Sequence, residues 1–407
     1  MIKEGYKETK IGILPEDWEV KKLGDVCYDG GKYGANAPAV PYNTKLPTYL
    51  RITDISDDGK IINEKLSSVD IPDYEDYILK KNDLVFARTG NTTGKTYLYA
   101  EKDGKLVYAG FLIKFSINPL LSEPKFIKFI TETNYYSNWV KLMSQRSGQP
   151  GINSKEYGNL EVPLPPLKEQ QKIAEILTKW DNHIETLENL ISKKEEYKKG
   201  LMQNLLTGKV RFPGFNEEWK EVKLGEIVYE PKKNKLENPE NYELLMVKLH
   251  CKGIEKTGKY PKPTKKGRPY YIRNFGELLI GRQNFHNGGI GIVTSNIKNC
   301  IASNAITSLL PHKNCNLNFL VYYISRFDYY KKAEYLMGGT GQKELSQTEL
   351  LKLKIQLPPI EEQEKIAEVL TLQDKEIEIL KEKLELLKLQ KKGLMQKLLT
   401  GEIRVKC

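Results

Sequence analysis

The sequence predicts an α+β protein made by internal duplication, with two mixed α/β blocks separated by a pair of long antiparallel coiled-coil helices. The first observation is a repeat: residues 165–211 recur as 358–404 at a constant offset of 193, without gaps and with about half of the positions identical. The second is that apolar residues in both copies follow heptad spacing. The third is that both blocks show the same order of short strand-like and helical segments.

Each copy of the repeat has the features of one long helix. It starts after a Pro-Pro pair, carries glutamate in its first turn, and ends at Thr-Gly, where Gly208 or Gly401 can form a left-handed cap. About 38 residues predict a rod of roughly 57 Å. The predicted seam between the helices comprises Ile173, Leu177, Ile184, Leu187, Ile366, Leu370, Ile377 and Leu380.

Chain connectivity favours an antiparallel pair, because the first helix leads into the second block and the second helix returns. Two equal rods can then cover each other's apolar stripes. The alternative is that the rods serve homodimerisation or are ordinary bundle helices.

The blocks contain short β-branched or aromatic segments that are typical of strands, such as 83–87, 106–108 and 111–115. Helical periodicity rich in tyrosine covers 126–143 and 318–337. A second, shorter sequence repeat, at an offset of 201, relates Trp18 to Trp219 near the start of each block. The expected boundaries are a first domain at 1–164, a first spacer helix at 165–208, a second domain at 209–357, and a second spacer helix at 358–401 with a short tail to 407.

The charge is unevenly distributed. The 407 residues carry 64 Lys+Arg against 53 Asp+Glu, a net charge of +11, and residues 213–357 alone hold 23 basic against 14 acidic residues. Within them, residues 260–273 interleave basic and aromatic side chains, as a surface that follows a phosphate backbone does. Arg268 and Arg273 are therefore candidate DNA contacts, although a solvated loop explains the segment equally well.

Several classes of protein are disfavoured. The mean hydropathy of −0.53 and the lack of an apolar run near 18 residues argue against a membrane span. The N-terminal lysines have no apolar segment behind them, so we expect a cytoplasmic protein without a secretory signal. Five cysteines without a CxxC pair and four scattered histidines indicate neither disulfides nor a metal site.

No catalytic motif is found. Residues 90–96, GNTTGKT, have three residues between the glycines where a phosphate-binding loop needs four, and a strand-like segment follows instead of a helix. No glycine-rich cofactor fingerprint and no Asn-Pro-Pro-aromatic methyltransferase signature is present. We expect no catalytic residues in this chain.

The chain resembles the specificity subunits of type I restriction-modification systems. The resemblance rests on LPPLKEQQKIAEIL and its second copy LPPIEEQEKIAEVL, on both KKGLMQxLLTG helix ends, on PEDWEVKKLGDV and on NDLVFARTGNTTGK. It implies two target-recognition domains, each reading one half of a split, asymmetric site in double-stranded DNA, and spacer helices that dock two methyltransferase subunits. It also implies that this chain binds no cofactor, that S-adenosylmethionine is in the methyltransferase partner, and that ATP and Mg are in the restriction subunits.

Candidate DNA-contacting side chains lie in polar loops of both blocks. Arginine can bind guanine with two hydrogen bonds, and asparagine suits adenine. In the first block the candidates are Arg88, Thr89, Asn91, Thr92 and Lys95; in the second they are Arg282, Gln283 and Asn284. Gln149 and Asn153 in the first block, and Gln342 and Lys343 in the second, lie in the loops before each helix.

Two alternatives remain open. The chain could instead serve a fused methyltransferase-nuclease, or it could be an autonomous nucleic-acid enzyme with an unrecognised site. Incubation of the pure chain with DNA, Mg²⁺ and S-adenosylmethionine would expose such an enzyme.

Overall fold

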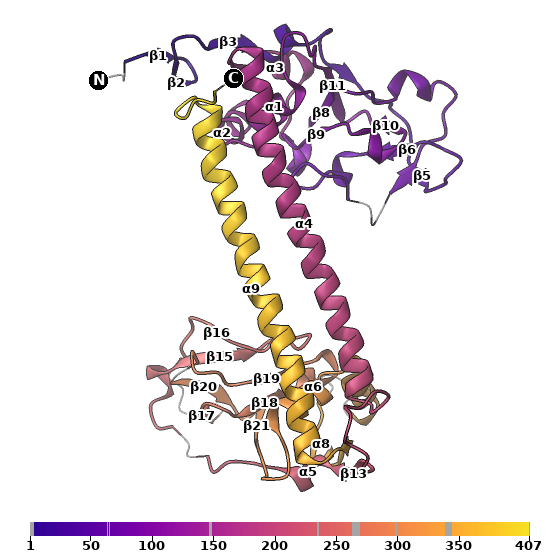
Figure 1. The fold of residues 1–407 in the computed structure, drawn as a ribbon, viewed down its shortest axis with the longest axis vertical. Helices are drawn as coiled ribbons and strands as arrows, with labels where there is room; N and C mark the ends of the chain where they lie inside the picture. Colours follow the sequence, from indigo (N-terminus) through magenta and orange to yellow (C-terminus); the bar gives the residue numbers. More distant parts are fainter. Residues whose placement is uncertain are drawn as a thin grey trace. The chain divides into compact units, whose positions relative to one another are not determined.

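The computed structural model describes residues 4–62, 64, 66–145, 149–233, 236–262, 269–297, 299–337 and 344–406 (Figure 1). The chain divides into two compact units. Unit 1 comprises Met1–Leu187 with Lys383–Cys407, and unit 2 comprises Glu188–Glu382. Each unit therefore contains one block of the sequence together with the beginning of one long helix and the end of the other.

Unit 1 contains two four-stranded sheets, with strand orders β4-β11-β8-β9 and β10-β6-β7-β5, and two antiparallel strand pairs, β1-β2 and β3-β12. Its strands are β1 (Tyr6–Thr9), β2 (Gly12–Pro15), β3 (Glu19–Lys22), β4 (Lys32–Tyr33), β5 (Val40–Pro41), β6 (Thr48–Leu50), β7 (Ser67–Ser68), β8 (Asp83–Ala87), β9 (Thr96–Leu98), β10 (Leu106–Tyr108), β11 (Leu112–Ser116) and β12 (Glu161–Leu164). Its helices before the spacer are α1 (Pro124–Ile130), α2 (Asn134–Met143) and α3 (Ser154–Gly158), and the 3₁₀ turn η5 (Gly90–Thr92) follows β8.

Unit 2 repeats this plan. Its four-stranded sheets have the orders β14-β21-β18-β19 and β16-β15-β20-β17, and β13 pairs with β22 as β3 pairs with β12. The strands are β13 (Lys220–Lys223), β14 (Val228–Tyr229), β15 (Glu243–Val247), β16 (Ile254–Lys256), β17 (Tyr270–Ile272), β18 (Leu278–Gly281), β19 (Ile290–Ile292), β20 (Cys300–Ser303), β21 (Ile306–Pro311) and β22 (Lys354–Leu357). The helices are α5 (Leu224–Ile227), α6 (Leu317–Ile324), α7 (Phe327–Lys332) and α8 (Gln347–Lys352), with the 3₁₀ segment η8 (Arg282–Asn287) after β18.

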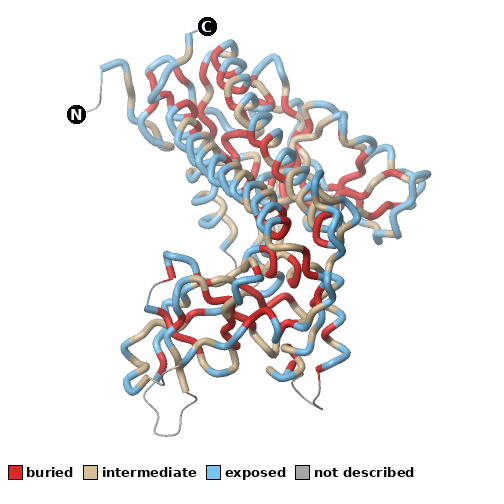
Figure 2. The backbone as a smooth tube through the Cα atoms, turned by 60° about the horizontal axis from the view of Figure 1, so that its bottom comes forward, coloured by how far each residue is buried: buried red, intermediate tan, exposed pale blue. Residues whose placement is uncertain are grey.

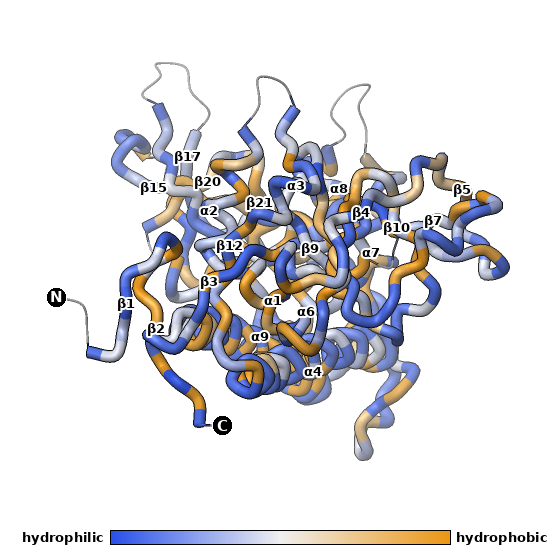
Figure 3. The backbone as a smooth tube through the Cα atoms, turned by 90° about the horizontal axis from the view of Figure 1, so that it is seen from above, coloured by the Kyte–Doolittle hydropathy of each residue, from blue (hydrophilic) through white to orange (hydrophobic). Residues whose placement is uncertain are grey.

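The spacer helices are α4 (Leu167–Leu205) and α9 (Ile360–Leu399). Ile173 and Leu177 near the start of α4 share a core with Leu398 near the end of α9 in unit 1, and Leu205 shares a core with Ile366 in unit 2. Within each unit the start of one helix thus packs on the end of the other, which confirms the antiparallel arrangement. Turns of both helices, seen from above, carry hydrophobic as well as hydrophilic residues (Figure 3).

The helix ends follow the sequence pattern closely. Gly208 and Gly401 have φ values of 68° and 70°, the left-handed conformation predicted for them. Seven of the eight predicted seam residues are buried, and Leu380 is half-buried. A strip of apolar side chains at three- and four-residue intervals therefore faces the interior.

Buried segments run through the interior of each block (Figure 2). In unit 1, Phe86 and Phe115 from the central strands pack with Phe126 of α1. In unit 2, Ile280 and Leu309 pack with Phe319 of α6 in the equivalent positions of the chain.

The tyrosine-rich helical segments are interrupted, contrary to the sequence prediction. The segment at 126–143 forms α1 and α2, because the Thr133 hydroxyl accepts a hydrogen bond from the Tyr136 amide and starts a new helix. The segment at 318–337 likewise forms α6 and α7, which are separated at Ser325 and Arg326.

Candidate nucleic-acid interface

The polar loop after β8 is fixed by its backbone. The Arg88 amide donates to the Phe111 carbonyl at 3.0 Å, and the Arg88 carbonyl accepts from the Ile152 amide at 2.9 Å. The Gly90 amide donates to the Pro150 carbonyl at 3.0 Å. Two groups of candidates that were predicted separately, 88–95 and 149–153, therefore form one surface.

The Arg88 guanidinium lies over the Tyr33 ring, 4.8 Å from its centre. Among the described residues it makes no hydrogen bond or ion pair, and the side chain is half-buried. Stacking on an aromatic ring holds a guanidinium in place while its N–H groups point outward in its own plane. Arg88 is thus positioned to donate hydrogen bonds to a ligand.

The glycine at the end of this loop is required by geometry. Gly94 has φ of +92°, and a Cβ atom there would lie 2.6 Å from Cγ1 of Val140. Its carbonyl accepts a hydrogen bond from the Tyr136 hydroxyl at 2.9 Å. These contacts fix the loop against α2.

The other candidates in unit 1 differ in how freely they can bind DNA. Asn91 and Gln149 are exposed, whereas the Thr92 hydroxyl donates to the Thr89 carbonyl at 3.4 Å. The Lys95 ammonium donates to the Ile55 carbonyl at 3.1 Å and pairs with the exposed Asp57 at 2.8 Å. The Lys95 charge is therefore partly neutralised.

Asn153 has a structural task. Its Oδ1 accepts the Glu156 amide at 2.9 Å, while the Glu156 carboxylate accepts the Asn153 amide at 2.8 Å, a capping box at the start of α3. The carbonyl end of this side chain is consequently engaged in the helix cap.

In unit 2, Arg282 takes the place of Arg88. Its amide donates to the Ala305 carbonyl at 3.4 Å and its carbonyl accepts from the Leu345 amide at 3.2 Å, the same two backbone contacts that fix Arg88. The side chain differs, because Nη2 donates to the Asn304 carbonyl at 3.2 Å and lies 2.8 Å from Glu344 Oε1. The equivalent arginine is thus held by a carboxylate.

Gln283 and Asn284 follow in η8, which is anchored by the fully buried Phe285. Together with Arg282 and Met246 they line a hollow of about 200 Å³. Asn284 is exposed and Gln283 half-buried. The three predicted candidates of this loop therefore lie around one surface depression.

Arg273 is not a surface residue, and its prediction as a DNA contact was wrong. Its side chain is 1% exposed, and Nη2 donates to the carbonyls of Ser303 at 3.1 Å and Ile306 at 2.9 Å. Burial lowers the pKa of its guanidinium. Arg268, Gln342 and Lys343 lie outside the described residues.

The comparisons with known proteins match this architecture. The model of the type I restriction modification DNA specificity domain matches residues 15–195 and again residues 216–389. The MjaVIII type I restriction enzyme specificity subunit of Methanocaldococcus jannaschii is 28% identical over 99% of this chain and 97% of its own length. A second protein of that organism, assigned as the MjaX type I restriction enzyme specificity subunit, is 32% identical over the same shares.

The chain belongs to the family of type I restriction-modification specificity subunits. Members of this family are the non-catalytic DNA-recognition components of their complexes, so the specificity subunit described here carries two DNA-recognition domains and acts with methyltransferase and restriction subunits.

Solved structures support the fold of this specificity subunit. The type I restriction-modification S subunit from M. genitalium aligns with a TM-score of 0.59 and 17% identity, covering 94% of this chain and 96% of that one. A chain from a study of complex assembly and conformational transition of the type I system aligns with a TM-score of 0.51 and 18% identity, covering 96% and 99%.

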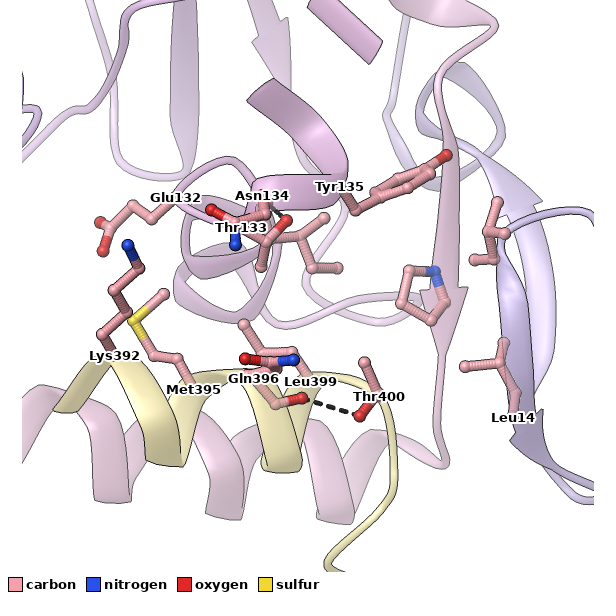
Figure 4. A pocket seen from close by; sticks show the side chains of 13 residues that line it. Leu14, Glu132, Thr133, Asn134, Tyr135, Lys392, Met395, Gln396, Leu399 and Thr400 are labelled. Atoms are coloured by element: carbon pink, nitrogen blue, oxygen red, sulfur yellow. Dashed lines mark hydrogen bonds between the residues drawn. The ribbon is translucent and has the colours of Figure 1, made fainter. Parts of the chain in front are cut away.

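Other features of the specificity subunit bear on its chemistry. No helix in the described ranges is long and apolar enough to cross a membrane. Within those same ranges, no group of three or more His, Cys, Asp or Glu residues is arranged to hold a metal ion. A cavity of about 230 Å³ in unit 1 has an apolar floor that includes Met395 and Leu399, with Glu132 and Lys392 at its rim (Figure 4). Its lining suits an apolar group better than a phosphate.

Sequence reasoning missed two aromatic residues beside Arg88. Tyr33 and Phe111 come from β4 and from the turn before β11, and their side chains are 43% and 58% exposed. An exposed phenylalanine after Ala-Gly in a loop is the signal in the sequence, but only strand pairing brings it to Arg88.

Proposed function

We propose that each recognition domain reads one half of a bipartite, asymmetric DNA site, with Arg88 in the first domain and Arg282 in the second at the centre of each reading surface. One observation carries this proposal: the two arginines have the same backbone contacts, to 111 and 152 in one unit and to 305 and 345 in the other. Two domains that hold an arginine by the same backbone contacts, but surround it with different side chains, can recognise different bases.

The surroundings of the two arginines favour asymmetry. Arg88 stacks on Tyr33, whereas Arg282 pairs with Glu344. The loops that follow also differ, because TGNTTG after Arg88 is replaced by QNFHNGG after Arg282. Different hydrogen-bond groups in the major groove select different bases.

We further propose that the spacer helices dock two methyltransferase subunits. Beside its buried seam, α9 exposes a second apolar stripe at seven-residue spacing, Leu372, Ile379 and Leu386, which are 54%, 63% and 54% exposed. Apolar residues repeated along one face of a helix, and left in solvent by this chain, are typical of a helix that binds a partner helix. In this proposal S-adenosylmethionine is bound by the methyltransferase partner, and ATP and Mg by the restriction partner.

The experiment is to co-express the chain with the methyltransferase subunit of its own system and to map methylated adenines by single-molecule sequencing. A split, asymmetric motif that depends on this chain is the expected result. Arg88→Ala should relax base choice in one half of the motif and Arg282→Ala in the other, each by about 10- to 100-fold at one position.

Two outcomes would contradict the proposal. An assembled complex that methylates without a bipartite motif would overturn the division into half-sites. Equal relaxation of both halves by either arginine variant would overturn the assignment of one domain to each half.

A further inference from the structure

One face of the β4-β11-β8 sheet passes from the core to the surface at the Arg88 loop. Phe86 on β8 pairs with Ile113 on β11, which in turn pairs with Tyr33 on β4. Phe86 and Ile113 are fully buried, and since side chains alternate along a strand, Arg88 and Phe111 lie on the same face two residues further on. The Arg88 amide, which donates to the Phe111 carbonyl at 3.0 Å, continues this register.

This face therefore ends in a guanidinium next to an exposed phenyl ring. Phe111 is 58% exposed although it stands beside a well-packed core, and the turn that carries it is tied down at both ends. The Gly110 amide donates to the Ala35 carbonyl at 2.7 Å, and the Leu112 amide donates to the Ala109 carbonyl at 2.8 Å. The ring is thus held in solvent by a rigid turn.

We propose that Phe111 contacts the C5-methyl group of a thymine in the first half-site, beside the base that Arg88 reads. This inference rests on the proposed function, because it adds one base to the same reading surface. In the major groove, the O6 and N7 atoms of guanine accept hydrogen bonds from arginine, and the thymine methyl is the apolar group that a base edge presents. The N–H donors of the Arg88 guanidinium suit guanine, and the adjacent Phe111 ring suits the methyl group of a neighbouring thymine.

Unit 2 lacks this pairing. Ala305 occupies the place of Phe111, because the Arg282 amide donates to its carbonyl. Alanine is too short to extend from the turn as Phe111 does, and Arg282 is engaged by Glu344. At this place in the fold, therefore, the first domain presents a phenylalanine and the second domain an alanine.

The test replaces thymine by uracil, which removes only the C5-methyl group. The complex of this chain with its methyltransferase is assembled, its motif is mapped, and each thymine of the half-site assigned by Arg88→Ala is replaced in turn in a synthetic duplex. We expect one of these replacements to weaken DNA binding about fourfold when the complex contains the chain without substitutions. This is the effect of losing one buried methyl group. Phe111→Ala should weaken binding to the thymine duplex by at least as much and be insensitive to that same replacement.

Leu120→Ala is the matched control, because Leu120 is an exposed apolar residue of the same unit, 80% exposed, away from the loop. This variant should keep the full sensitivity to uracil. Phe111→Leu, which retains an apolar side chain, should keep part of it, and the melting temperature of each variant confirms folding.

Three results would overturn the inference: a first half-site without thymine, an unmodified complex that binds every uracil duplex as tightly as the thymine duplex, or a Phe111→Ala complex that keeps the uracil effect. All three leave a bipartite motif intact, so they are distinguishable from failure of the proposed function, in which no such motif is found.

Discussion

The Arg404 guanidinium binds the Glu169 carboxylate through two hydrogen bonds, Nε to Oε1 at 2.7 Å and Nη2 to Oε2 at 2.8 Å. Glu169 is 3% exposed and also accepts the Trp18 indole N–H at 3.2 Å. Arg404, which lies five residues beyond the end of α9 at Leu399, is thereby joined to the first turn of α4, where Trp18 also binds. Unit 2 has the same arrangement in Arg211, Glu362 and Trp219.

We predict that Arg404→Ala lowers the free energy of unfolding by about 2 kcal/mol. The variant leaves the buried Glu169 carboxylate without its cation, and the cost is moderated because the arginine is 40% exposed in the intact pair. Urea unfolding followed by tryptophan fluorescence measures the loss. Lys21→Ala, which removes an exposed ion pair with Glu19, should change nothing measurable. If Arg404→Ala is as stable as the parent chain, the Arg404–Glu169 ion pair does not contribute to stability.

A second prediction concerns Lys391, which lies 2.6 Å from Asp181 and 3.2 Å from Glu132, above the Phe129 ring at 5.2 Å. Burial alone would lower the pKa of Lys391, but the two carboxylates outweigh it and raise the pKa above its ordinary value of 10.5. Its contribution to stability is therefore fully present below about pH 10.5 and is lost as the pH rises through the raised value.

Lys391→Met should accordingly destabilise the chain by about 3 kcal/mol at neutral pH, since two partly buried carboxylates lose their cation. As the pH rises from neutrality, the difference from the parent chain should begin to shrink only above about pH 10.5, which thermal unfolding at a series of pH values can follow. Lys397→Met, at an exposed pair with Glu402, serves as the control. A difference that already shrinks between about pH 7 and pH 9 would contradict the assigned role of the ammonium charge.

A third prediction compares the buried and the exposed apolar faces of α9 by changing one isoleucine on each face. Ile377 is 6% exposed and Ile379 is 63% exposed, two positions apart on the same helix. Ile377→Asp should cost about 3–5 kcal/mol because it buries a carboxylate without a partner. Ile379→Asp should leave stability within about 0.5 kcal/mol while weakening the association with the methyltransferase.

Urea unfolding and analytical ultracentrifugation with the partner measure these two effects. If Ile379→Asp binds the methyltransferase as well as the parent chain does, the exposed stripe is not the docking face. If Ile377→Asp is as stable as the parent chain, the predicted seam is misplaced.

The long helices were predictable because their pattern is local. Heptad spacing identified Ile173, Leu177 and Ile366 as core residues, and all are at most 1% exposed. Leu380 is only half-buried. Heptad spacing predicts on which face of the helix a residue lies, but not how completely other parts of the chain cover that face. The repeated Gln170 and Gln363 were seen as parts of a motif. Their buried side chains accept hydrogen bonds from the Glu123 and Asn316 amides, which lie 47 residues away along the chain.

The reading surface was less predictable because it depends on strand pairing. Arg273 follows Ile272 in a basic and aromatic segment, yet the arginine is buried and the isoleucine is 38% exposed. The acceptors that permit this burial, the carbonyls of Ser303 and Ile306, are 30 residues or more along the chain. Composition alone cannot distinguish such a satisfied interior arginine from one that binds DNA.

The last prediction concerns the carboxylate that holds Arg282. Glu344 Oε1 lies 2.8 Å from Arg282 Nη2, and the two side chains are 37% and 21% exposed. Glu344→Gln removes a negative charge from the proposed DNA surface and releases the guanidinium. We expect the assembled complex to bind DNA about three- to tenfold more tightly at about 50 mM salt, with a smaller gain at about 200 mM, because phosphate contacts are screened by salt. Fluorescence anisotropy with a labelled duplex measures both affinities.

Glu349→Gln, at an ion pair with Lys352 on α8, is the control and should have little effect. Weaker binding by Glu344→Gln would show that the carboxylate orients Arg282 toward DNA instead of restraining it, and this sign decides between the two roles.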